Sequence, residues 1–168
     1  SGRIDNAGLL VKTGSDSASL AMTLANTGTL RVAEGSLSAP GFTTNAGTLD
    51  LRAASTLSTG SLQNTGVIQG SGALNLGAGT LTNAGIVRPG DASSTGTLTV
   101  TGQFVQTAGG RIEADVLGTT AAQQDHLVVS GSAQIDGALV LAPASGLTFG
   151  ASDRYTVLSC GADACLSG

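Results

Sequence analysis

Two cysteines near the end of the chain are the residues with the clearest potential for chemistry. Cys160 and Cys165 enclose four residues and are the only cysteines among 168 residues. In an exported protein such a pair is expected to form a disulfide. Closing a loop of about six residues contributes roughly 2 kcal/mol in the loop-entropy model, and here it acts on a terminal segment. Two interpretations therefore stay open: a closed loop that a partner holds, or a staple in a terminal cap.

Metal binding and catalysis have little support in the residue pattern. The cysteine spacing differs from that of a Cys-x-x-Cys redox motif, and one histidine with no second cysteine pair argues against zinc. Asp125 and His126 are adjacent, but neighbours in a strand face opposite sides, so we interpret His126 as a plain surface residue. The other carboxylates in strand-like runs have outward parity: Asp5, Asp50, Glu113, Asp115 and Asp136. We expect no enzyme, no catalytic or metal-binding residues and no cofactor.

The elements that would position the cysteines are indicated by five copies of Asn-[Ala/Thr]-Gly. Their asparagines recur at a nearly constant spacing of about 20 residues: Asn6, Asn26, Asn45, Asn64 and Asn83. Leu24, Asn26 and Leu30 share one strand parity, so the asparagines are predicted to point inward at a corner and to stack into a ladder of amides. The glycine two places on would supply positive φ or a close backbone approach. An isolated Asn-x-Gly turn is the alternative, and five copies in register argue against it.

A fixed period of about 20 residues that contains strand-like segments is typical of a solenoid. Shorter strands are predicted between the asparagines, at residues 35–37, 55–57 and 72–76. The period is too long for a hexapeptide helix and lacks the leucine-rich and calcium-binding consensus patterns. We predict an all-β fold, a right-handed parallel β-helix of about eight rungs. Thr43 stands where the third repeat should have leucine, which predicts a local distortion there.

The regular pattern ends after residue 85, and we expect the asparagine ladder to stop with it. Residues 88–94 read as a polar loop, and alternating runs predict strands at 97–104, 111–116 and 155–158. One inward parity then continues along the chain through Leu127, Val129, Ala133, Ile135, Leu139 and Leu141. We treat 1–168 as a single β-helix segment with Asn-x-Gly rungs (1–90), divergent rungs and C-terminal capping strands (91–158), and a cysteine loop (159–168).

The composition restricts the class of protein. Charged residues make up 11%, aromatic residues 2% and hydrophobic residues 40%, with 26 glycines and a mean hydropathy of +0.26, which favours a folded chain with thin aliphatic stacks. A net charge of -4, with one lysine and six scattered arginines, argues against a nucleic-acid partner. No apolar run approaches the roughly 20 residues of a membrane helix. The chain opens inside a repeat without a signal-peptide pattern, so we expect a piece of a longer protein.

With its Asn-x-Gly rungs and the runs Gly96-Thr97-Leu98-Thr99-Val100-Thr101-Gly102 and Asp125-His126-Leu127-Val128-Val129-Ser130-Gly131, the chain resembles large β-helical adhesins of Gram-negative bacteria. The pattern is similar to that of filamentous-haemagglutinin-like exoproteins of two-partner secretion and of autotransporter passengers. A subset of two-partner-secretion adhesins ends in a small disulfide loop, a cysteine hook, that stays engaged with the outer-membrane pore. Cys160 and Cys165 sit where that hook would be.

The resemblance implies secretion through an outer-membrane transporter pore in unfolded form, followed by folding outside the cell. It implies a protein of the bacterial cell surface, anchored at the outer membrane, whose upstream regions bind a host receptor or glycan. Our first hypothesis is a C-terminal stalk and anchor of an adhesin, tethered to its pore partner through the Cys160–Cys165 loop. The alternatives are a passenger fragment of an autotransporter adhesin and a β-helical glycan-active enzyme.

Overall fold

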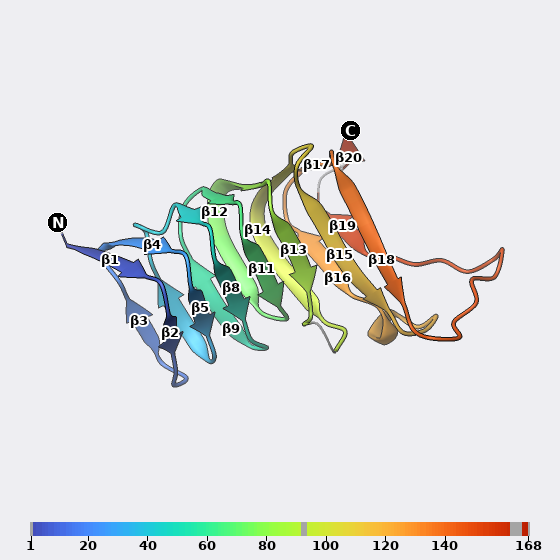
Figure 1. The fold of residues 1–168 in the computed structure, drawn as a ribbon, viewed down its shortest axis with the longest axis horizontal. Coiled ribbons are helices and arrows are strands. Elements are labelled where there is room, and N and C mark those ends of the chain that lie inside the picture. Colours follow the sequence, from blue (N-terminus) through green and yellow to red (C-terminus); the bar gives the residue numbers. More distant parts are fainter. Residues whose placement is uncertain (1, 92–93, 162–165, 168) are drawn as a thin grey trace.

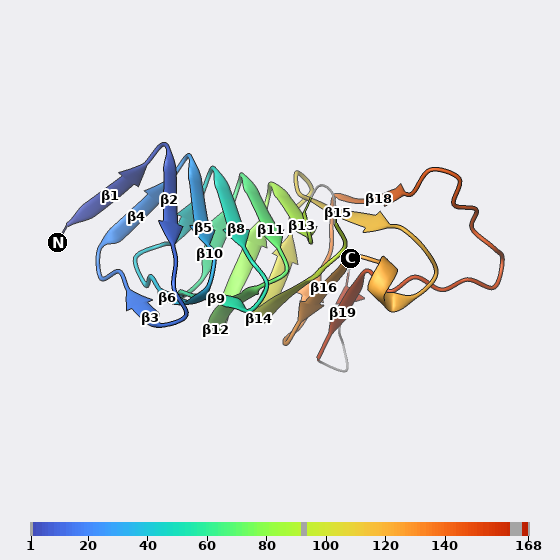
Figure 2. The same ribbon diagram turned by 90° about the horizontal axis from the view of Figure 1, so that it is seen from below.

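The computed structural model describes residues 2–91, 94–161 and 166–167, and it shows short strands stacked along one axis (Figure 1). Every pairing between the named strands is parallel, and each strand pairs with the equivalent strand of the neighbouring turn of the chain. The N-terminus lies at one end of the column and the last strands lie at the other (Figures 1 and 2). The fold is a parallel β-helix, as predicted.

Three faces run along the column, and each rung contributes one strand to each face. The first face contains β1 (Arg3–Asn6), β4 (Thr23–Asn26), β7 (Thr44–Asn45), β10 (Leu62–Asn64), the ends of β12 (Ala73–Asn83) and β14 (Thr97–Gln106), β17 (Ala133–Gln134) and β20 (Leu166–Ser167). The second contains β2 (Leu9–Lys12), β5 (Thr29–Val32), β8 (Thr48–Leu51), β11 (Val67–Gly70), β13 (Ile86–Pro89), β15 (Arg111–Val116) and β18 (Ala138–Pro143). The third contains β3 (Ser17–Ser19), β6 (Gly35–Ser38), β9 (Ser55–Ser58), the starts of β12 and β14, β16 (His126–Val129) and β19 (Leu158–Cys160).

These strands form seven complete rungs and the first strand of an eighth within the described part of the chain, in agreement with the predicted number. β12 and β14 each run from the third face of one rung into the first face of the next. One short 3-10 helix, η1 (Ala121–Gln123), lies between β15 and β16. The rungs lengthen toward the C-terminal end, because on the first face Leu81 pairs with Phe104, Phe104 with Ala133, and Ala133 with Leu166.

The interior is a set of aliphatic columns that follow from strand alternation. On the second face, Leu30, Leu49 and Ile68 are in register and have no exposed surface. In β5 and β8 the side chains on the opposite parity face outward and are polar or charged, whereas β11 has Val67 there as well as Gln69. Stacking of equivalent side chains therefore gives each rung its hydrophobic contacts through its neighbours, as expected for a solenoid.

The third rung is distorted where the sequence predicted it. β7 is shortened to two residues, and Thr43 is exposed. Phe42 takes the interior position instead and is fully buried, while its backbone N–H donates to the carbonyl of Ala39. The bulky side chain therefore fills the core from one residue earlier in the chain.

Two expectations for the C-terminal half are wrong, whereas the predicted inward parity of Leu139 and Leu141 is confirmed although both side chains are exposed. The last strand of the third face is β19 and covers Leu158–Cys160, so residues 155–157 precede it. Leu139 and Leu141 keep the inward register of Ile112 and Ala114, but they are 50% and 41% exposed because β18 is the last strand of its sheet. Part of the expected 88–94 loop is strand, because β13 continues to Pro89 and Gly90 pairs with Gly70.

The motif glycines allow adjacent rungs to approach closely. A Cβ built on Gly28, Gly47, Gly66 or Gly85 would lie 2.0 to 2.2 Å from the carbonyl oxygen of the equivalent glycine in the preceding rung. None of these glycines has positive φ, so of the two predicted reasons for glycine the close approach is the one that applies. Gly8 in the first rung has no atom within 4 Å of such a Cβ.

We predict that Gly66→Ala lowers the free energy of unfolding by about 3 kcal/mol or more, because the methyl group would force two backbones apart. Gly8→Ala is the matched control at the same motif position, and it should change stability by less than about 0.5 kcal/mol or stabilise slightly. Chemical denaturation of both variants measures the difference. Equal stability of the two variants would show that the close approach of the two rungs does not require glycine at residue 66.

Candidate functional site

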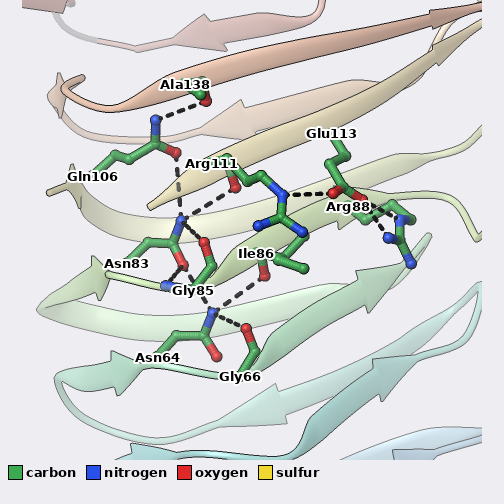
Figure 3. Close-up of polar contacts among 10 residues, drawn as sticks. All are labelled: Asn64, Gly66, Asn83, Gly85, Ile86, Arg88, Gln106, Arg111, Glu113 and Ala138. Atoms are coloured by element: carbon green, nitrogen blue, oxygen red, sulfur yellow. Dashed lines mark hydrogen bonds and ion pairs between the residues drawn. The ribbon is translucent and has the colours of Figure 1, made fainter. Parts of the chain in front are cut away.

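The five asparagines form one continuous ladder at the corner between the first and second faces. Each side-chain amide nitrogen of the first four donates to Oδ1 of the asparagine in the following rung, at 2.7 Å from Asn6 to Asn26 and 2.8 Å for the three later pairs. The same nitrogen also donates to a backbone carbonyl of the following rung, as Asn64 does to Ile86 (Figure 3). Asn26, Asn45, Asn64 and Asn83 are at most 2% exposed, so the amides are satisfied inside the protein rather than by water.

The ladder continues one rung beyond its predicted end. Asn83 donates to Oε1 of Gln106, and Nε2 of Gln106 donates to the carbonyl of Ala138 (Figure 3). The same nitrogen also donates to the carbonyl of Asp136. Gln106 is 1% exposed, and its longer side chain reaches backbone carbonyls of the following rung, where Ile135 stands in this column. The signal in the sequence is a polar residue on the inward parity of Leu98, Val100 and Phe104, without the glycine two places on that marks the earlier corners.

We predict that Asn64→Leu lowers the free energy of unfolding by about 2 to 4 kcal/mol, because leucine leaves the buried amide of Asn45 and the carbonyl of Ile86 without the bonds that Asn64 provides. Gln63→Leu, which changes the exposed neighbour in the same strand, should cost less than about 0.5 kcal/mol. Thermal and urea unfolding compare the two variants. An Asn64→Leu variant as stable as Gln63→Leu would contradict the structural importance of the ladder.

Charged side chains on the second face form pairs between rungs. Asp50 has the predicted outward parity, yet it is only 1% exposed, because Arg31 and Arg52 cover it with contacts of 2.7 and 3.0 Å. Glu113 is held by Arg88 from the preceding rung and by Arg111 from its own strand (Figure 3). Burial tends to raise the pKa of Glu113, but hydrogen bonds and charge from these two arginines outweigh it and lower that pKa. These groups neutralise one another and leave no concentrated charge.

Asp125 is a buried carboxylate whose environment the sequence did not reveal. It has no exposed surface, and it accepts hydrogen bonds from the backbone N–H groups of Gly96 and Asp115 at 2.8 and 2.9 Å. Burial raises its pKa to about 6; the two backbone donors act in the opposite direction, and the charges of Asp115 and Asp91 add to the increase. The carboxylate joins the segment before β14 to β15, beside the backbone hydrogen bond from the N–H of His126 to the carbonyl of Gly96.

His126 is partly buried, so its interpretation as a plain surface residue was incomplete. Its Nε2 lies 2.9 Å from Oγ of Ser159 in the following rung. The adjacent Asp125 binds backbone groups instead of the imidazole, as strand geometry requires. Within the described residues the histidine therefore has a serine neighbour but no carboxylate that orients its ring.

We predict that Asp125 makes the protein less stable as the pH rises from 4 to 7. Its folded pKa of about 6 lies above the usual value of 3.8, so the neutral form is favoured by folding and this stabilisation is lost as pH rises through 6. The loss is on the order of 3 kcal/mol. Unfolding curves at several pH values should show it, and Asp125→Asn should remove this pH-dependent component whatever its effect on absolute stability.

Glu113 supplies the comparison of opposite sign, because its pKa is lowered and its contribution is lost as the pH falls. A direct NMR titration of both carboxyl groups separates them. A midpoint for Asp125 at or below that of an exposed aspartate would contradict the assignment.

Cys160 ends the last described strand of the third face. It occupies the inward column of Leu74, Val100 and Val129, and it packs, partly buried, against the core. Val129, its equivalent one rung earlier, precedes the corner that leads to Ala133, and β20 begins at Leu166 in register with Ala133. Cys160 therefore stands where the preceding rung turns from the third face to the first. Cys165 lies outside the described residues, and its bond to Cys160 stays a prediction.

No cluster of three or more metal-ligating side chains occurs in residues 2–91 and 94–161. The same part of the chain contains no helix long and apolar enough to cross a membrane. Comparisons with models of protein families, with curated proteins and with solved structures find no match to this chain. The described residues contain a ladder of amides, charge pairs on the second face and a cysteine at the end of the last described strand of the third face, and these features lie at separate places in the column.

Proposed function

We propose that this chain is the C-terminal stalk and anchor of a bacterial surface adhesin of the two-partner-secretion type. In this proposal, the β-helix is a spacer and the loop closed by Cys160 and Cys165 is the part held by the outer-membrane pore. The protein would be secreted and would remain at the cell surface. The proposal rests on the position of Cys160, which ends the third-face strand of the last complete rung in the described part of the chain.

The stalk role is supported by the way the rungs stack. Each regular rung repeats the same amide bonds and the same leucine contacts, so the column lengthens without a change of fold. Its charges are distributed in pairs between neighbouring rungs, for example Arg31 with Asp50. Such a surface suits a rod that spaces two other parts of a molecule.

The anchor role is supported by the strands on both sides of the cysteine loop. β19 pairs with β16 and β20 pairs with β17, so both strands are fixed to the preceding rung. Pulling on a closed loop would then load these strands and the column behind them, rather than a free tail. A bridge across about six residues adds only roughly 2 kcal/mol to stability, which favours retention over core stabilisation as its purpose.

We predict that Cys160→Ser with Cys165→Ser releases the adhesin from the cell surface into the medium while the β-helix melts within a few degrees of the unchanged protein. The reason is that the bridge contributes little to the core but closes the loop that the pore would hold. The measurement is immunoblotting of cell and medium fractions, together with circular dichroism of the purified protein. Each single cysteine variant should be released to the same extent.

Gln63→Leu, far from the loop, is the control for retention of an intact rod. Full retention of the double cysteine variant would contradict the anchor and favour the alternative, an autotransporter passenger held by its own membrane domain. Release accompanied by unfolding would instead indicate that the cysteines staple the cap.

A further inference from the structure

The outer side of the first rung is equivalent to the side with which each later rung contacts the rung before it. Ile4, Leu10 and Leu20 border an open hollow of about 210 Å³ there, and all three are only partly buried. Leu24 and Leu30, which are in register with Ile4 and Leu10 one rung later, are 2% and 0% exposed. The difference arises because no described residue covers the outer side of the first rung, so this face presents the contacts that a preceding rung would make.

The direction of the ladder leaves one acceptor unused at this face. Each asparagine from Asn6 to Asn64 donates through Nδ2 to the following one, and each Oδ1 from Asn26 onward accepts from the preceding one. Oδ1 of Asn6 accepts no hydrogen bond from any described residue. It lies where an amide of a preceding rung would complete the series.

Gly8 gives a second and independent indication. At the other four motif positions glycine is required, because a Cβ would collide with the glycine carbonyl of the preceding rung, as at Gly28 against Gly8. At Gly8 a Cβ would meet nothing within 4 Å. Among the described residues nothing requires glycine at this position, whereas another Asn-x-Gly corner lying on it would.

The opposite end of the column does not match this face. The ladder ends at Gln106, whose Nε2 is used by the carbonyls of Asp136 and Ala138, and the next rung has Ile135 after Gln134 in the corresponding column. A second copy stacked by its C-terminal end would thus offer no amide to Asn6. Lys12 lines the hollow in the inward register of Val32, and its ammonium donates to the carbonyls of Asp16 and Glu34, so an occupant has to pack on its aliphatic chain.

We propose that the outer side of the first rung is a docking surface for one further rung of the same kind. Its occupant carries an asparagine whose Nδ2 donates to Oδ1 of Asn6, a glycine two residues later whose carbonyl lies over Gly8, and leucine-like side chains that fill the hollow. The surface is selective, because a rung without the amide leaves Asn6 unsatisfied in a newly buried site. This inference is independent of the anchor proposed for the other end.

The test adds a copy of residues 61–79 directly ahead of Arg3, which places the copied Asn64 before Asn6 at the same spacing that separates Asn45 from Asn64. Hydrogen exchange of the backbone amides in β1 and β2 is the measurement. We expect exchange to slow by about tenfold or more, because opening the first rung must now break buried contacts. The melting temperature should rise as well.

Three matched variants decide the specificity. The extended protein with leucine at the copied Asn64, and the extended protein with Gly8→Ala, should each lose most of that protection, although Gly8→Ala leaves the unextended protein unchanged. A scrambled extension of the same length and composition should give none. Equal protection by the leucine-bearing or the scrambled extension, protection that survives Gly8→Ala, or no protection by the unaltered extension would overturn the proposal.

Discussion

The close contact between motif glycines and the carbonyls one rung earlier is the constraint on which the rest of the structure depends. A separation that excludes even a Cβ brings consecutive corners within hydrogen-bond reach of each other. The backbone N–H groups of Thr65 and Gly66 can then both donate to the carbonyl of Asn45. With the corners fixed in this way, the amides and leucines of successive rungs fall into straight columns.

The same constraint explains where the regular column changes. After Gly85 the Asn-x-Gly corner is not repeated, and the following corner begins with Gln106 instead. From that point the rungs lengthen, and inserted residues have to be connected by other means, such as the buried carboxylate of Asp125. Regular rungs need only their repeated contacts, whereas divergent rungs depend on individual polar groups.

The sequence was sufficient to predict the β-helix and the inward asparagines. Identical residues make the same contact in each rung, so the same residue pattern recurs along the sequence and can be recognised. The sequence was insufficient where a residue makes a contact that occurs in a single rung and is not repeated. Gln106 continues the ladder with a different side chain. The burial of Asp50 depends on two arginines, Arg31 in β5 and Arg52 directly after β8. The exposure of Leu139 could not be read from parity, because parity gives the direction of a side chain but not whether another rung covers it.

The two ends of the column differ in a way that gives the proposed stalk a direction. Amide donors of the ladder point toward the end that carries Cys160, where Gln106 and the carbonyls of Asp136 and Ala138 terminate the series. The unused acceptor of Asn6 lies at the other end, which is open and apolar. If the cysteine loop is held at the membrane, the face suited to further rungs points away from it. Additional rungs would then lengthen the rod outward without disturbing the held end.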